Sequence, residues 1–148
     1  MRIVFSGLDG VMHPWRASRV GFGDVPVRLF EWLDVLEALL APHEDVFVVL
    51  HSHWRHEMTD GELAAALRCI GDRFLGSVPK GPRYSGILQW LAKNPSVSSF
   101  RILDDQASEF PQPPPAELVL CHPEAGIYDW KVRRQLQEWL HELSTTVS

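Results

Sequence analysis

The stretch Ile3-Val4-Phe5-Ser6-Gly7-Leu8-Asp9-Gly10-Val11 decides the fold, because a short apolar run breaks there into a polar turn. The apolar part predicts a strand over residues 2–5, and Asp9-Gly10 has the composition of a turn. In parallel α/β sheets, ligand sites lie at the carboxyl ends of the strands, where such polar residues follow. The rest of the chain decides whether a sheet of that kind forms.

Apolar runs recur along the whole chain. Strands are expected at 46–50, 74–78, 100–103 and 118–121, and helices at 27–40, 62–70, 82–91 and 130–143. Pro26 is well placed to start the first helix, Thr59 or Asp60 to cap the second, and Gly71 to end it. Because strands alternate with helices, the sequence predicts an α/β fold of three layers. Its sheet would be mostly parallel, with helices on both faces and right-handed crossovers.

Size and composition narrow the class of protein. The 148 residues are 45% hydrophobic, which suits one domain over residues 1–148 with a packed core. The net charge of −5 gives no general support for nucleic-acid binding, although a local basic patch is compatible with it. No apolar run reaches the ~20 residues that cross a bilayer, and the N-terminus is no signal peptide. Cys69 and Cys121 have the pattern of reduced thiols, which indicates a cytoplasmic protein.

Polar residues follow the predicted strands where a ligand site is expected. A crevice at the strand ends would bring together acids, a hydroxyl and cations. Carboxylates hold Mg²⁺, while hydroxyl, ammonium and guanidinium groups hold phosphoryl oxygens. The candidate residues are Asp9, Ser52, Arg55, Lys80, Arg83, Asp104 and Asp105. Arg83 competes with Lys80 for the role of phosphate-binding cation.

Four short motifs, in order, resemble those of the haloacid-dehalogenase-like (HAD-like) phosphatases. The stretch 3–11 resembles the first motif, hydrophobic residues followed by D-x-D-G-V. Val48-Val49-Leu50-His51-Ser52 resembles the second, Lys80 the third, and Ile102-Leu103-Asp104-Asp105 the fourth. Trp54-Arg55 and Gly126-Ile127 are similar to small HAD domains found alone or in RNA-repair proteins. The loop 11–25 and the segment 60–78 are too short for a large cap domain.

The resemblance assigns roles to these residues. The metal ligands would be Asp9, Asp104 and Asp105, and Asp9 would also be the general acid and base. Ser52, Lys80, Arg55 and Arg83 would hold the phosphate, the first two as part of the catalytic set. The expected cofactor is Mg²⁺. The expected ligand is a phosphate monoester, including a polynucleotide or protein phosphate end, since an uncapped site admits bulky substrates.

Gly7 departs from the family pattern, which has the nucleophilic aspartate at this position. Glycine can form no aspartyl-phosphate and offers no carboxylate to a metal. Loss of such a nucleophile costs about 10⁴–10⁶ in turnover. We therefore expect an impaired phosphohydrolase with weak Mg²⁺ binding, which Gly7→Asp would repair. A natural pseudoenzyme that binds a phosphorylated ligand or a protein partner is the first alternative.

The second alternative is a metal-dependent hydrolase that uses histidines. Several histidines fall near the predicted strand ends, and imidazole is a common zinc ligand. Their spacing matches no closed structural zinc pattern. The histidines in question are His13, His51, His53, His56 and His122.

Overall fold

The computed structural model describes residues 1–8, 11–13, 32–51 and 59–146. Their centre is a five-stranded parallel sheet in the order β3-β2-β1-β4-β5. Its strands are β1 (Arg2–Ser6), β2 (Val46–Leu50), β3 (Phe74–Ser77), β4 (Ser99–Asp104) and β5 (Leu118–Leu120). All four strand pairings are parallel. The predicted parallel α/β fold is therefore confirmed.

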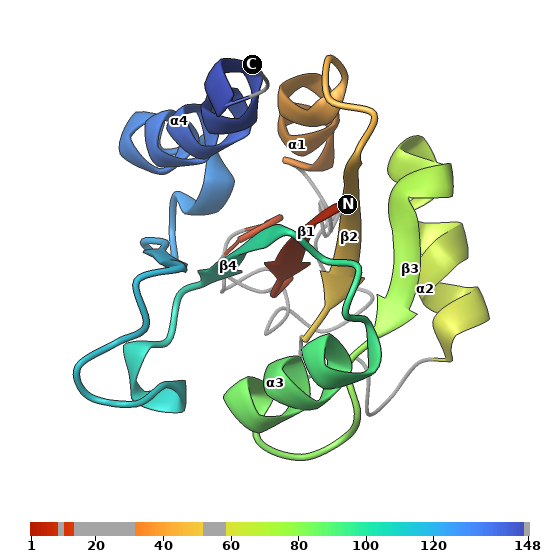
Figure 1. Cartoon of the computed structure of the whole chain (residues 1–148), viewed down its shortest axis with the longest axis vertical. Coiled ribbons are helices and arrows are strands. Elements are labelled where there is room, and N and C mark those ends of the chain that lie inside the picture. The colour runs from red at the N-terminus through yellow and green to blue at the C-terminus, as the bar shows by residue number, and fades with distance from the viewer. Residues whose placement is uncertain (9–10, 14–31, 52–58, 147–148) are drawn as a thin grey trace, which may run out of the picture.

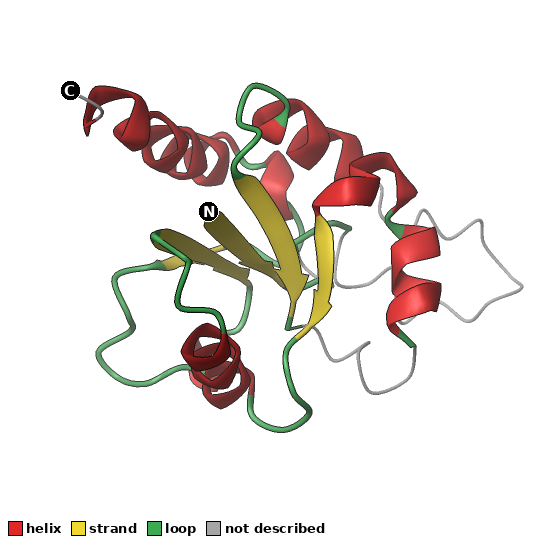
Figure 2. Ribbon diagram, turned by 45° about the vertical axis from the view of Figure 1, so that its right-hand side comes forward, coloured by secondary structure: helices red, strands yellow, loops and turns green. Residues whose placement is uncertain are grey.

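Helices cover both faces of the sheet (Figure 1). The α-helices are α1 (Leu33–Leu40), α2 (Asp60–Ala66), α3 (Arg83–Lys93) and α4 (Trp130–Thr146). Short 3₁₀ segments complete the set: η3 (Arg68–Arg73), η4 (Ala107–Glu109) and η5 (Gly126–Tyr128). In Figure 2, α1 and α4 lie on one side of the strands and α3 lies on the other.

The alternation of side chains along β1 divides the core between the two faces. Val4 packs with buried leucines of α1 and α4, among them Leu36 and Leu136. Ile3 and Phe5 belong to the cluster on the α3 side, whose other members include Val49, Ile87, Ile102 and Phe110. Both faces of the central strand are therefore buried, which explains why its middle residues, Ile3 to Phe5, are all apolar.

Several helix boundaries differ from the sequence-based expectation, most of all the start of the first helix and the end of the second. The first helix begins at Leu33, because Trp32 has non-helical backbone angles (φ −106°, ψ 13°); residues 27–31 lie outside the described residues. The second helix is capped by Thr59, one of the two predicted caps, in a capping box with Glu62, but it begins at Asp60, ahead of the predicted start at 62. It ends earlier than predicted, at Ala66, and the chain continues as η3. The tighter turns still deliver Ile70 to the core, so a continuous helix is unnecessary for its burial.

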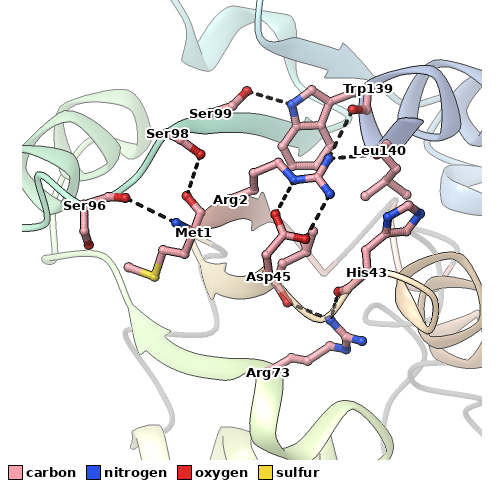
Figure 3. Close-up of polar contacts among 11 residues, drawn as sticks. Met1, Arg2, His43, Asp45, Arg73, Ser96, Ser98, Ser99, Trp139 and Leu140 are labelled. Atoms are coloured by element: carbon pink, nitrogen blue, oxygen red, sulfur yellow. Dashed lines mark hydrogen bonds and ion pairs between the residues drawn. The ribbon is translucent and has the colours of Figure 1, made fainter. Parts of the chain in front are cut away.

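A buried arginine ties the amino end of the sheet together (Figure 3). Arg2 is only 2% exposed, and its guanidinium lies against both carboxylate oxygens of Asp45 at 2.7 and 3.0 Å. The same group donates to the main-chain carbonyls of Trp139 and Leu140 in α4. Arg73 acts similarly on α1 and donates to the carbonyl of Leu40 at its last turn. These contacts of Arg2 and Arg73 therefore stabilise the amino end of the sheet.

We expect Arg2→Leu to lower the free energy of unfolding by about 3 kcal/mol. The leucine would leave Asp45 without its cation and two buried carbonyls without their donor. Urea denaturation monitored by circular dichroism measures the change. Arg134→Leu is the matched control, because Arg134 is exposed on α4 and its ion pair with Glu138 lies in solvent. A similar loss in both variants would contradict the role given to Arg2.

Candidate functional site

The register of three strands brings the candidate residues level at the carboxyl end of the sheet. Ser6 of β1 is paired with Leu50 of β2 and with Leu103 of β4. The next residue on each chain segment is Gly7, His51 or Asp104. Main-chain hydrogen bonds hold this alignment, from Gly7 N to the Leu103 carbonyl (2.9 Å) and from His51 N to the Ser6 carbonyl (3.1 Å).

Asp104 is the centre of the site and is fully buried. Its Oδ2 lies 2.7 Å from Nε2 of His51, which is also fully buried. Nη1 of Arg83 lies 3.0 and 2.9 Å from Oδ1 and Oδ2, and the main-chain N–H of Gln106 donates to Oδ1 at 2.9 Å. Every side of the carboxylate is therefore occupied by a protein group.

These contacts keep Asp104 ionised. Burial, the largest single influence, raises the pKa of this carboxyl group, but the contacts around it together outweigh burial, led by the hydrogen bond and charge of His51. Arg83 and the Gln106 amide act in the same direction, and the pKa of Asp104 falls to about 2. An ionised carboxylate only accepts hydrogen bonds, so Nε2 of His51 must carry the hydrogen between them.

Asp105 behaves in the opposite way to its neighbour. It is partly buried, and this burial together with the negative charge of Asp104 raises the pKa of Asp105 to about 6. The charge of Arg83 acts in the opposite direction on the pKa of Asp105, but its guanidinium is already paired with Asp104. The ionised form of Asp105, which predominates at neutral pH, is therefore energetically unfavourable in the folded protein.

Gly7 has room for a side chain. A Cβ built on it would lie 3.6 Å from the Leu103 carbonyl oxygen, 3.6 Å from a methyl of Val11 and 3.7 Å from Nε2 of His51. These are ordinary van der Waals distances, so the backbone itself tolerates a larger residue. Of these three neighbours, the imidazole of His51 is the one that also contacts Asp104.

A close approach of α3 to the chain before it positions Arg83. A Cβ at Gly86 would lie 2.9 Å from a methyl of Val78 and 3.0 Å from the Pro79 carbonyl oxygen. Only glycine permits that contact without a shift. The first turn of α3, which carries Arg83, therefore packs directly on the loop that leaves β3.

The predicted site residues fall into three groups. Gly7, Arg83 and Asp104 come together, with Asp105 beside them. Lys80 is exposed on the loop between β3 and α3, and Arg83 rather than Lys80 pairs with Asp104. Three others, Asp9, Ser52 and Arg55, lie outside the described residues. The catalytic and binding roles of all of them remain predictions.

The contact between His51 and Asp104 is absent from the sequence-based prediction. The sequence indicates only that His51 follows a strand and shares a face with His53. The pairing depends on the register of β1 with both neighbours, which no local pattern reveals. His51 comes one residue after β2, and Asp104 is the last residue of β4. Had the register of these strands with β1 been known, the sequence would have indicated that the two side chains lie side by side.

The segment after β5 packs against the loop that follows β1. The N–H of Ile127 donates to the Val11 carbonyl at 2.9 Å. Gly126 has φ 49°, and a Cβ there would lie 2.5 Å from that carbonyl oxygen and 2.6 Å from the Trp32 ring. This contact leaves Tyr128, which stacks on Trp32, at the surface beside the carboxyl end of the sheet.

Tyr128 and its neighbours form an aromatic and basic surface. Tyr128 and Trp130 are each 59% exposed. The guanidinium of Arg133 lies 5.4 Å from the Tyr128 ring centre, and the Lys131 ammonium lies 5.9 Å from that of Trp130. Exposed rings with adjacent cations suit nucleobases and phosphates. We call Tyr128, Trp130, Lys131 and Arg133 the aromatic–basic surface.

The described residues contain neither a cluster of metal-binding side chains nor a membrane-spanning helix. Within these residues no group of three or more histidine, cysteine or acidic side chains is arranged to hold a metal ion. Two of the histidines proposed for a hydrolase, His53 and His56, lie outside them. None of the helices in the described part of the chain is long and apolar enough to cross a bilayer.

We expect Asp105→Asn to raise the melting temperature at pH 7. The folded-state pKa of Asp105 is raised from 3.8 to about 6, so the stability it contributes is full below about pH 4 and is lost as the pH rises through 6. Asparagine removes that loss, and the gain should vanish near pH 4. Thermal denaturation from pH 4 to 8 measures it, with the exposed Asp72→Asn as control. An Asp105→Asn gain that is independent of pH would contradict the assignment.

Comparisons with known proteins agree with this geometry. No curated protein and no solved structure gives a significant match to the chain. One family model does match, over residues 3–132, which spans all five strands and reaches into α4. The chain belongs to the family described as the HAD domain in Swiss Army Knife RNA repair proteins.

Proposed function

We propose that this HAD-type phosphohydrolase scaffold binds a phosphate monoester and has lost most of its ability to hydrolyse it. The observation that carries the proposal is Gly7, level with Asp104 at the carboxyl end of the sheet, in a chain of this family. The nucleophilic carboxylate would stand at this position, and glycine leaves no group there to attack phosphorus. Binding, which depends on other residues, does not require that carboxylate.

The described residues fit poorly to a magnesium ion, on which HAD domains generally depend. The position-7 carboxylate is missing, and both oxygens of Asp104 are already engaged by His51, Arg83 and Gln106. A hard divalent cation needs several free oxygen ligands in addition to water. We therefore assign weak Mg²⁺ binding to this chain and derive no step through the ion.

Phosphate binding would depend on the cations and amides around the first turn of α3. Lys80 is exposed just before this helix and is available to a ligand at the strand ends. Arg83 keeps the charge of Asp104 neutralised, so that an incoming phosphate does not meet a bare buried anion. Asp9, Ser52 and Arg55 would complete the set in the roles that the resemblance gives them.

The ligand we favour is a phosphorylated end of a single-stranded polynucleotide. The family is described from RNA repair proteins. The aromatic–basic surface lies on the segment that packs against the loop after β1. A base stacked on an exposed aromatic contributes about 1–3 kcal/mol to binding, whichever base it is. Such contacts explain how a chain of net charge −5 could still hold a polynucleotide.

Binding of a short oligonucleotide, with and without a terminal phosphate, tests the proposal. We expect the phosphorylated form to bind at least about tenfold tighter, a difference that Lys80→Ala reduces. Lys93→Ala is the matched control, an exposed lysine at the far end of α3. Equal affinity for the two oligonucleotides would refute phosphate recognition. Rapid hydrolysis of an aryl phosphate by the unchanged chain would refute the role of Gly7 and favour the histidine-based hydrolase.

Trp130→Ala tests whether the ligand is a polynucleotide, independently of whether its phosphate is recognised. It should weaken binding of the phosphorylated oligonucleotide about tenfold and leave binding of a small aryl phosphate unchanged. Leu88→Ala on α3 is the control, since Leu88 is 47% exposed and lies outside this surface. Loss of both ligands in Trp130→Ala, or of neither, would refute a polynucleotide path over Trp130.

A further inference from the structure

We infer that His51 and Arg83 stand in for the divalent cation at this site, so that the chain holds its acidic centre together without a metal. The inference concerns the empty protein and does not depend on phosphate binding. It rests on what surrounds Asp104, on the space at Gly7 and on the burial of the groups involved.

The imidazole of His51 lies between position 7 and Asp104. Its Nε2 is 2.7 Å from Oδ2 of Asp104 and 3.7 Å from the place of a Cβ on Gly7. A cation shared by carboxylates at positions 7 and 104 would have to lie in this same gap. The ring nitrogen therefore fills the space that both the missing side chain and the ion would need.

The carboxylate of Asp104 has no free direction left. Oδ1 is contacted by Arg83 and by the Gln106 amide, and Oδ2 by His51 and Arg83. A carboxylate accepts about four hydrogen bonds through its two oxygens, so two polar neighbours on each oxygen saturate it. Mg²⁺ could bind only by displacing one of these partners, and it also gives up its own waters reluctantly.

Displacement is costly because the partners are held in the interior. His51 is fully buried, and its ring packs edge-on against Phe110 with 6.3 Å between centres. The side chain of Arg83 is 17% exposed and is anchored to the first turn of α3. Removing one partner of a buried charged pair leaves the other without compensation. His51 and Arg83 therefore neutralise Asp104 in the position where the ion would otherwise lie.

Gly7 and His51 form a matched pair. A methyl group at position 7 would already meet Nε2 at ordinary contact distance, 3.7 Å, so a carboxylate directed from there at the same centre as Asp104 would have to come closer to the ring. Glycine at 7 and histidine at 51 are thus mutually compatible, whereas an aspartate at 7 requires the ring to yield. A change at position 7 alone leaves Asp104 covered by His51.

Calorimetric titration with MgCl₂ tests the inference on four forms of the full chain: unchanged, Gly7→Asp, His51→Ser, and both together. The double variant should bind Mg²⁺ about 10–100-fold tighter than the unchanged chain, because it restores a carboxylate and frees an oxygen of Asp104. Gly7→Asp alone should gain only a small part of this. A double variant that gains nothing, or a single variant that gains as much, would overturn the inference.

The control is Gly7→Asp with His141→Ser, which changes a histidine in α4 that packs on His43 near the amino end of the sheet. It should behave like Gly7→Asp alone. Circular dichroism establishes that each variant is folded.

Nitrogen-15 resonances of the histidines in the unchanged chain provide a test without substitution. The Nε2 signal of His51 should not move on adding Mg²⁺; a saturable shift would show that the ion displaces the imidazole and would overturn the inference.

Discussion

The Gly7→Asp/His51→Ser double variant is expected to hydrolyse a small aryl phosphate in the presence of Mg²⁺ at least about 10³-fold faster than the unchanged chain. The gain is part of the 10⁴–10⁶ that a covalent nucleophile is worth in enzymes of this kind. The backbone permits the change, since a Cβ at position 7 meets neighbours no closer than 3.6 Å. Serine at 51 removes the ring that a carboxylate would otherwise meet.

Steady-state kinetics with a chromogenic aryl phosphate measures this gain. Gly7→Asp alone, which the sequence by itself indicates as the repair, should recover less, because His51 still covers Asp104. Gly7→Asn/His51→Ser is the matched control, with the same shape but no nucleophilic carboxylate. If the asparagine form is as active as the aspartate form, position 7 has no part in the chemistry.

The second large effect is expected at Asp104. Asp104→Asn should lower the free energy of unfolding at pH 7 by about 3 kcal/mol, because Arg83 and His51 lose a buried anion. Asp105→Asn, the same substitution one residue later, should not destabilise the protein at this pH, since ionised Asp105 is unfavourable there. Urea denaturation of the two variants measures the contrast.

The pH dependence of this loss provides a check on its cause. The pKa of Asp104 is lowered in the folded protein from 3.8 to about 2. Its stabilising contribution is therefore present above about pH 4 and is lost as the pH falls toward 2. The difference between Asp104→Asn and the unchanged chain should shrink over that range. A difference that stays constant down to pH 2 would mean that packing, and not charge, is the cause.

Much of the fold could be read from local sequence. The apolar run at 46–50 predicts a strand covered on both faces, and the shorter run at 2–5 predicts another strand. Both are found inside the sheet, and their side chains enter the core clusters on its two faces. Thr59 and Glu62 mark the start of α2 through hydrogen bonds three residues apart. Alternation of such strands with helices was sufficient to predict the parallel sheet, and it placed the candidate site at the carboxyl end of that sheet.

The sequence by itself also determined that position 7 lacks a nucleophile, since a missing carboxylate needs no structure to recognise. What it could not determine is which cation neutralises Asp104, because Lys80 and Arg83 stand three residues apart on the same approach to α3. Only the packing of α3 on the β3 loop selects Arg83. Only the register of β1 with β2 and β4 brings His51, far from Asp104 along the chain, within 2.7 Å of it. Contacts of this kind depend on how strands align in three dimensions, and local composition carries no record of that alignment.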